Sequence, residues 1–279
     1  MQRCLAHSLS MKQWLIILAL LMTTPAQSAD VVHLYAAGSL RDALDETRAA
    51  FTQATGIAVE AKYGPSGLLK DEIAGGANAD VFASANMDHP QALARAGKSG
   101  PVVLFARNRL CALVRPGLAV DQTTLLDRML DPANKLGTST PKSDPSGDYA
   151  WEVFRKADAL RPGAFATLSG KALQLMGGPN SPPPPANRVL YGALVADGKA
   201  DIFLVYCTGA RAAQRENPDQ QIVEFPDALA VGADYGLTVM LTASPAAYRF
   251  AMFILSDGQR ILANQGFVAP NLPSSARGR

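Results

Sequence analysis

Histidine is scarce in this chain, which has 3 in 279 residues. The two beyond the N-terminal segment, His33 and His89, have no spacing typical of a metal site. A serine hydrolase needs a histidine base, and residues 64–67 (GPSG) lack the second glycine of the G-x-S-x-G nucleophile elbow. No G-x-x-x-x-G-K-[ST] phosphate loop occurs. We therefore predict no catalysis, no resident metal and no cofactor, and keep a serine hydrolase as a remote alternative.

Long apolar runs are missing beyond the N-terminus. The one long run, residues 14–22, follows Arg3 and Lys12 and precedes small residues at 23–29. This order is typical of a secretory signal peptide, and the run is too short to span a membrane. A buried helix is the competing interpretation, but the run does not alternate with polar residues at helical spacing. We predict that residues 1–29 are removed and that the mature protein is soluble and exported.

Charge of one sign is not in excess. The chain has 26 Lys and Arg against 24 Asp and Glu, a formal net charge of +2 with histidine neutral. Residues 1–29 hold two basic residues and no acidic one, so the mature chain is formally neutral. A neutral body argues against binding nucleic acid or an anionic membrane through broad electrostatics. An anionic ligand would have to be held by local dipoles and hydrogen bonds.

Cysteine is also rare, because only Cys111 and Cys207 remain once Cys4 leaves with the leader. An even pair in an exported protein could form a disulfide. Cys111 also lies on a predicted apolar strand and Cys207 directly follows one, and small unpaired thiols are common at such buried positions. We favour two unpaired buried cysteines and leave the disulfide open.

Short apolar strands alternate with amphipathic helices along the rest of the chain. The predicted strands are residues 31–36, 57–63, 81–84, 110–114, 136–139, 202–206, 221–225 and 237–241. Helices are expected from Ser39 to Gly56, from Ser66, from 145 to 154, from 188 to 196, and from 245 to 264 with a break near 256–258. This alternation is typical of an α/β fold with mainly parallel sheets. No internal repeat of solenoid spacing is present.

Three of these helices begin at small hydrogen-bonding residues directly after a strand or turn: Gly38-Ser39, Gly64-Pro65-Ser66-Gly67 and Pro145-Ser146-Gly147. We expect Ser39 and Ser66 to cap their helices. A helix N-terminus also presents unpaired N–H groups and partial positive charge, which attract anions. In parallel sheets such turns lie at the carboxyl ends of the strands, where ligands bind. The pattern favours an anion site, although spacing alone does not prove that the three turns converge.

Five ordered segments resemble one known family. They are residues 35–40 (YAAGSL), 64–67 (GPSG), 79–85 (ADVFASA), 105–110 (FARNRL) and 235–239 (YGLTV). Together they resemble the periplasmic molybdate-binding proteins of ABC transporters, and the likeness covers nearly the whole mature chain. The resemblance implies a two-lobed periplasmic-binding-protein fold of type II, in which crossing strands join two α/β lobes around the anion. Tungstate and other oxyanion binders share this scaffold.

The resemblance also implies the site. Ser39 and Ser66 would supply hydroxyl and backbone donors, Ser146 and Leu190 backbone N–H groups, and Tyr206 its phenol. Arg188 is a further candidate, although it is more simply interpreted as a surface charge. Such uncharged donors would select a fully deprotonated, doubly charged oxyanion by hydrogen bonding, and pocket size would discriminate against sulfate.

Three features depart from the family pattern. Gly209 stands where the family has an acidic residue, residues 177–185 form an unusual insertion, and Asp148 lies in the first turn of the third helix. A carboxylate there favours the helix dipole, but it would repel a dianion if it faced the cleft.

The predicted lobe one comprises residues 30–108 and 227–279, and the predicted lobe two residues 109–226. The expected partners are the oxyanion and the ABC-transporter permease, with no nucleic acid, and the protein is expected to be a monomer in the periplasm. The alternative is a binding or sensor protein of the same fold for another small anion or for ferric ion. Iron sites in this scaffold favour clustered tyrosines with carboxylates, and the sequence has no adjacent tyrosine pair.

Overall fold

The computed structural model describes residues 31–182 and 188–270. The predicted signal peptide, and residues 183–185 of the predicted insertion, lie outside this range. The strands are β1 (Val32–Ala37), β2 (Val59–Gly64), β3 (Val81–Ser84), β4 (Val103–Val114), β5 (Leu136–Ser139), β6 (Leu173–Met176), β7 (Ile202–Tyr206), β8 (Gln221–Glu224) and β9 (Gly232–Val239).

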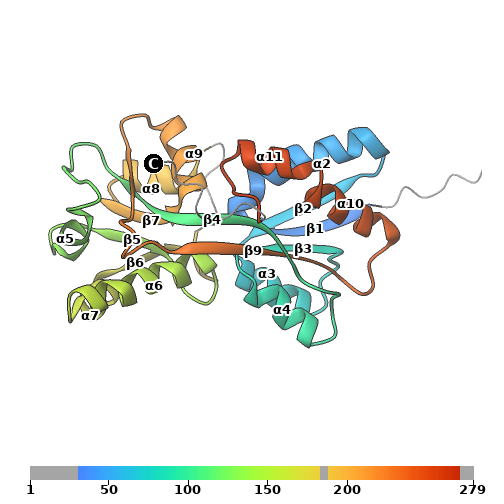
Figure 1. Cartoon of the computed structure of the whole chain (residues 1–279), viewed down its shortest axis with the longest axis horizontal. Coiled ribbons are helices and arrows are strands. Elements are labelled where there is room, and N and C mark those ends of the chain that lie inside the picture. The colour runs from blue at the N-terminus through green and yellow to red at the C-terminus, as the bar shows by residue number, and fades with distance from the viewer. Residues whose placement is uncertain (1–30, 183–187, 271–279) are drawn as a thin grey trace, which may run out of the picture. The chain divides into compact units, whose positions relative to one another are not determined.

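The helices flank these strands (Figure 1). A 3₁₀ turn, η2 (Gly38–Leu40), precedes α2 (Arg41–Thr55), and the others are α3 (Ser66–Ala74), α4 (Asp88–Arg95), α5 (Leu125–Leu130), α6 (Pro145–Leu160), α7 (Ala164–Lys171), α8 (Leu190–Ala196), α9 (Cys207–Glu216), α10 (Pro245–Leu255) and α11 (Gly258–Asn264). Within the described ranges, no helix combines the length and apolar character that a bilayer crossing requires.

The strands pair in the order β2-β1-β3-β9-β4-β7-β5-β6, with β8 added to β4. β1 runs parallel to β2 and β3, and β5 runs parallel to β6 and β7. The antiparallel pairs all involve β4 or β9. β3, β5 and β7 are fully buried and β1 is mostly buried, as expected for strands that are covered on both faces. The predicted α/β class is confirmed. Among the described strands four pairs are parallel and four are antiparallel, so the sheet is mixed rather than mainly parallel.

β4 belongs to two groups of strands. Residues 103–109 pair with β9, and residues 110–114 pair with β7. We call β1, β2, β3, β9 and the first part of β4 the first strand group, and β5, β6, β7, β8 and the rest of β4 the second strand group. In Figure 1, β4 and β9 run through the middle of the described chain, between the parallel strands of the two groups. The change of partner, between Arg109 and Leu110, lies beside the predicted lobe boundary, and the lobe ranges themselves stay predictions.

Predicted element ends differ from the structure where polar residues interrupt an apolar run. β4 begins at Val103 rather than Leu110, and β9 begins at Gly232 rather than Leu237. In these strand halves the alternation of apolar, inward-facing residues, which would predict a strand, is not evident in the sequence. Polar residues interrupt it at Arg107, Asn108, Arg109 and Asp234. β6, α5, α7 and α9 have no sequence-based counterpart. Gly56 ends α2 in the left-handed conformation, as predicted.

Cys111 and Cys207 form a disulfide, so the preference for two unpaired cysteines is wrong. Cys111 lies opposite Val205 in the β4–β7 pairing, and Cys207 begins α9 two residues beyond Val205. Their Cα atoms are 5.0 Å apart although 96 residues separate them in the sequence. Spacing alone could not reveal that strand pairing brings the two residues together.

Removing this disulfide should lower the free energy of unfolding by about 2–4 kcal/mol, because a crosslink over so long a loop restricts the unfolded chain. Urea unfolding of Cys111→Ala/Cys207→Ala under non-reducing conditions measures the loss. A reductant should lower the wild-type midpoint and leave that of the variant unchanged. Equal wild-type and variant midpoints without reductant would contradict this prediction.

Candidate ligand-binding site

A cavity of about 210 Å³ opens where several parallel strands end. Its wall includes the turn after β1, the turn after β2, Ala85 just beyond β3, and the end of β7. The start of α8 and residues 176–178 and 181–182 complete it. These are carboxyl ends of strands and the helix starts that follow them, where open α/β sheets bind ligands. Both strand groups contribute to this wall.

Four of the residues predicted for the site line this cavity: Ser39, Ser66, Leu190 and Tyr206. Leu190 is the first residue of α8, where helix N–H groups lack intrahelical acceptors. Ser146 is not among the described residues that line this cavity. Its buried hydroxyl has no hydrogen-bond partner among the described residues. Whether any of these residues binds a ligand stays a prediction.

Ser39 does not cap a helix, contrary to expectation. Its Oγ lies 3.0 Å from the Tyr235 phenol oxygen. The Asn108 side-chain amide also donates to the Tyr235 phenol oxygen, at 3.4 Å. Either hydroxyl can donate in the Ser39–Tyr235 bond. When Tyr235 donates, the Ser39 proton is available to an acceptor in the cavity.

Ser66 is the first residue of α3 and also makes no cap. Its buried Oγ accepts the Ala85 N–H at 3.1 Å, which leaves the hydroxyl proton for another acceptor. The next residue, Gly67, donates its N–H to Ser143 O at 2.9 Å. This bond joins α3, which follows β2 of the first strand group, to the loop between β5 of the second strand group and α6. It lies next to Ser66, which lines the cavity.

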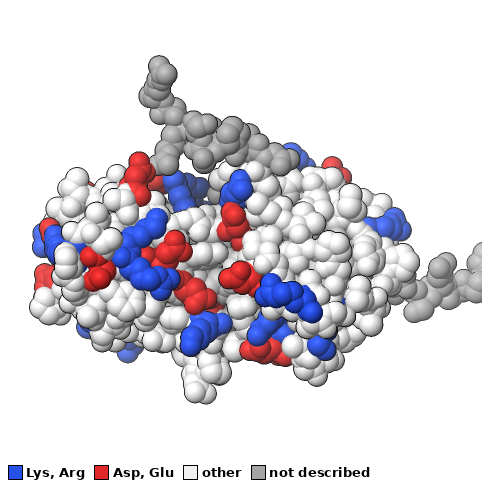
Figure 2. Space-filling view, turned by 60° about the horizontal axis from the view of Figure 1, so that its bottom comes forward, with Lys and Arg blue, Asp and Glu red and all other residues white. Residues whose placement is uncertain are grey.

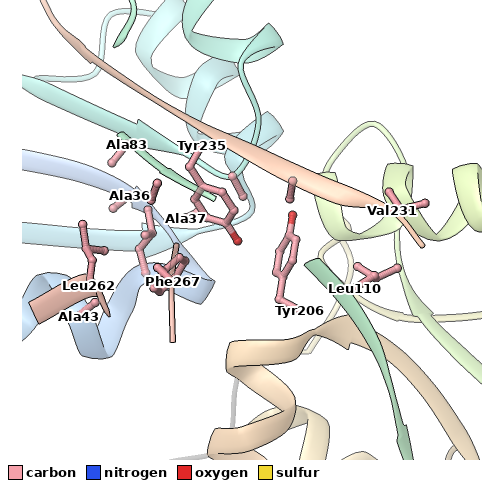
Figure 3. Packing of buried hydrophobic residues seen from close by; sticks show 14 of the residues in the cluster. Ala36, Ala37, Ala43, Ala83, Leu110, Tyr206, Val231, Tyr235, Leu262 and Phe267 are labelled. Carbon is pink, nitrogen blue, oxygen red and sulfur yellow. The ribbon is translucent and has the colours of Figure 1, made fainter. Parts of the chain in front are cut away.

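Tyr206 ends β7, and its side chain is 2 % exposed. Figure 3 shows Tyr206 beside Tyr235, among apolar residues that include Leu110 and Val231, and the two ring centroids are 5.6 Å apart. Burial raises the pKa of Tyr206 well above its usual value, so the phenol keeps its proton. The hydroxyl nevertheless has no hydrogen-bond partner in the described residues. A buried donor left unpaired at a cavity wall is a strong indication of a missing acceptor.

Besides the predicted uncharged donors, the cavity wall carries two ionisable side chains, Arg41 and Asp144. Arg41 lies at the start of α2, with Cζ 4.6 Å from the centroid of the Tyr63 ring. Asp144 caps α6 by accepting the Ser146 N–H at 3.1 Å. Burial raises the pKa of Asp144 to about 6, because the charged form loses hydration. Asp148, which raised concern in the sequence, instead accepts the Lys142 N–H at 2.8 Å.

Arg188 lies in a second cavity, of about 710 Å³, whose wall shares Ser39, Arg41 and Leu190 with the first. Its guanidinium is half-exposed and lies 3.6 Å from Asp197. This placement agrees with a surface charge and does not bring Arg188 into the smaller cavity.

Neither of the two histidines considered above lines the smaller cavity. His33 pairs with Asp80 at 3.0 Å, and burial lowers the pKa of His89. No cluster of three or more His, Cys, Asp or Glu side chains suited to a metal ion occurs in the part of the chain that the structure describes. Lys and Arg are interspersed with Asp and Glu on the face shown in Figure 2, so no field of one sign dominates that face.

A cavity lined by strand ends and helix starts, in an α/β fold with flanking helices, is an arrangement in which such folds bind small ligands. Over residues 32–268 the chain matches the family of bacterial extracellular solute-binding proteins, and it belongs to that family.

Among curated relatives, an uncharacterised protein of Pasteurella multocida is 33% identical over 241 residues, which cover 86% of this chain and 99% of the relative. The molybdate-binding protein ModA of Mycobacterium tuberculosis is 28% identical over 251 residues, 88% of this chain and 87% of ModA. These relatives confirm the resemblance seen in the sequence motifs.

Solved structures share the fold at lower identity. The periplasmic molybdate-binding protein of Azotobacter vinelandii has a TM-score of 0.66 at 20% identity, over 86% of this chain and 99% of that protein. The sulfate-binding protein SubI of Mycobacterium tuberculosis has a TM-score of 0.72 at 22% identity, over 86% and 87%. The fold is therefore common to binders of different ligands and does not identify the ligand of this chain.

Proposed function

We propose that this protein captures a tetrahedral oxyanion, molybdate, in the cavity between the two strand groups and delivers it to the permease of an ABC transporter. The observation that carries the proposal is the Tyr206 hydroxyl, a buried donor without an acceptor at the cavity wall. The Ser39 and Ser66 hydroxyls supply two further donors, and Leu190 and Arg41 add a helix start and a positive charge.

Size and chemistry both favour a small anion. The cavity of about 210 Å³ is smaller than the roughly 300–1,000 Å³ of pockets for drug-sized ligands. Hydrogen bonds to a charged group contribute about 1.5–3 kcal/mol each. Nanomolar affinity needs about 12 kcal/mol net, so several donors must meet the anion at once. Tungstate, with the same shape and charge, would bind at the same donors.

The proposed location is the periplasm, and this proposal rests on the family and on the predicted signal peptide. Members of this family are extracellular solute-binding proteins, and the disulfide fits an oxidising compartment such as the periplasm. Ligand binding would draw the two strand groups together by a hinge movement, and the permease would recognise the closed form. The proposed export by a signal peptide at residues 1–29 completes this account.

Titration calorimetry with molybdate, tungstate, sulfate and phosphate tests the proposal. Molybdate and tungstate should bind far more tightly than sulfate. Sulfate binding as tightly as molybdate would defeat selection by size, and stoichiometric iron in the purified protein would favour the ferric alternative. Ester hydrolysis that Ser66→Ala abolishes would favour an enzyme.

Tyr206→Phe should weaken molybdate binding about 10- to 150-fold, since one charge-assisted bond is lost. The unfolding free energy should not fall, because the hydroxyl removed has no hydrogen-bond partner among the described residues. Tyr248→Phe, at a half-exposed tyrosine on α10, is the matched control and should bind as wild type. Calorimetry and urea unfolding measure both effects. Wild-type affinity in Tyr206→Phe would remove the phenol from the site.

A further inference from the structure

Asp144 places a carboxyl group in the wall of a cavity proposed to hold an anion. Its Oδ1 accepts the Ser146 N–H. Among the described residues it forms no ion pair with Lys, Arg or His, in contrast to Asp45, Asp80 and Asp201. A carboxylate and a dianion without an intervening cation or proton repel each other strongly in a site shielded from water.

The carboxyl group is held in place and cannot easily turn away. A Cβ atom at Gly177 would lie 2.7 Å from both Cβ and Oδ2 of Asp144, so the backbone of residue 177 packs directly against this side chain. Gly177 also has φ of 76°, which other residues rarely adopt. It belongs to the predicted insertion, and the insertion therefore fixes Asp144 at the cavity.

The ionisable groups around Asp144 come from several elements. Asp148, on the same helix, adds negative potential, and Tyr191 of α8 and Tyr206 of β7 are neutral phenols that interact with it. Arg41 of α2 lines the same cavity, and the remaining titratable residue of the wall, Tyr63, donates to Asp45. Among the described lining residues Arg41 is thus the one cation, and it packs on the Tyr63 ring.

We propose that Asp144 shares one proton with the bound oxyanion, so that a fully ionised anion binds only while this carboxyl group carries a proton. Where the carboxyl group is ionised in the free protein, binding takes up that proton from solution. This inference rests on the proposed function and deepens it. As an acid, Asp144 donates its O–H to an anion oxygen while Oδ1 still accepts the Ser146 N–H. An anion that already carries one proton, such as monoprotonated phosphate, would donate that proton to the ionised carboxylate and need no uptake.

The direction of the pH dependence follows from the free and bound states. Without ligand, Asp144 loses its proton near pH 6. A bound dianion disfavours the carboxylate further, so the pKa rises in the complex. Affinity for a fully ionised anion therefore reaches its limit well below pH 6 and falls about tenfold for each pH unit above pH 7, which makes it about 100-fold weaker at pH 8 than at its low-pH limit.

Calorimetry at pH 8, in two buffers with different ionisation enthalpies, counts the protons taken up with the tightest-binding anion among molybdate, tungstate and sulfate. The wild type should take up close to one proton. Asp144→Asn keeps a good helix cap and a permanent donor. It should take up none, bind independently of pH between 6 and 8, and bind about 100-fold more tightly than wild type at pH 8.

Asp148→Asn is the matched control on the same helix. Above the pH at which Asp144 is half ionised, its affinity for the anion should fall with pH as steeply as that of the wild type. Tight binding by the wild type without proton uptake, or weaker binding by Asp144→Asn at pH 8, would overturn this inference and leave the proposed function standing. Absence of binding to every anion of the panel at pH 5.5 and pH 8 would instead remove the proposed function, and this inference with it.

Discussion

Gly67→Ala should weaken molybdate binding about 100-fold while the fold persists. A Cβ atom at residue 67 would overlap Lys142 O and would lie 2.7 Å from Ser143 O. Both are backbone oxygens, which cannot move aside as the end of a side chain can. Overpacking of this kind costs about 1–3 kcal/mol, and two backbone overlaps place Gly67→Ala near 3 kcal/mol. The strain disappears if α3 moves away from the Lys142–Ser143 loop, so the variant would favour an open cavity.

The molybdate affinity of Gly67→Ala should fall because donors from both strand groups must reach the same anion. Ser66 lies next to Gly67 on α3, whereas Tyr206 and Leu190 belong to the second strand group. Calorimetry gives the affinity and urea unfolding the stability. Gly170→Ala is the control, since a Cβ atom there, also within a helix, meets nothing within 4 Å. Wild-type affinity in Gly67→Ala would mean that binding does not require α3 and this loop to be in contact.

Ser39→Ala/Ser66→Ala should weaken molybdate binding by about 3–6 kcal/mol, a factor of about 10² to 10⁴. Each substitution removes one hydroxyl donor to a charged ligand, and such bonds contribute about 1.5–3 kcal/mol. The fold should survive at a reduced stability. Ser66→Ala leaves the Ala85 N–H without its acceptor, and Ser39→Ala removes the hydrogen bond between residue 39 and the Tyr235 hydroxyl.

The control must remove two serine hydroxyls elsewhere. Ser169 and Ser256 each donate to a carbonyl of the preceding helical turn and line neither cavity described here. Ser169→Ala/Ser256→Ala should therefore bind molybdate as wild type does. If the Ser39→Ala/Ser66→Ala variant also kept wild-type affinity, the anion site would lie elsewhere in the protein.

Local sequence signals predicted the scaffold well, because they depend on neighbouring residues. The strands at 81–84, 136–139 and 202–206 have the predicted bounds. Pro145 begins a helix, Gly56 ends one, and the break between α10 and α11 falls at the predicted 256–258. Apolar runs, prolines and glycines determine these features within a few residues of chain.

Contacts between distant residues could not be predicted in this way. Ser39 bonds Tyr235 across 196 residues and Ser66 bonds Ala85 across 19, so neither serine is available as a helix cap. A serine before a helix looks the same in the sequence whether it caps or binds a distant partner. The same limit explains why the Cys111–Cys207 disulfide was judged wrongly.

The sequence does not predict that Asp144 lies at the cavity. An aspartate before a proline is typical of a helix start, and such a residue is simply interpreted as a helix cap. In the structure Asp144 lines the cavity and packs beside Gly177, which is far away in the sequence. The sequence does not predict the clustering of tyrosines either. The ring of Tyr206 contacts those of Tyr149 and Tyr235, although no two tyrosines are adjacent in the sequence.

The central claim is that donors from both strand groups meet on one oxyanion. A crystal structure of the protein with tungstate, located by its strong anomalous scattering, tests this claim most directly. We expect the anion in the smaller cavity, with its oxygens within hydrogen-bond distance of the Ser39, Ser66 and Tyr206 hydroxyls. Tungstate bound outside that cavity, or held by residues of a single strand group, would contradict the account.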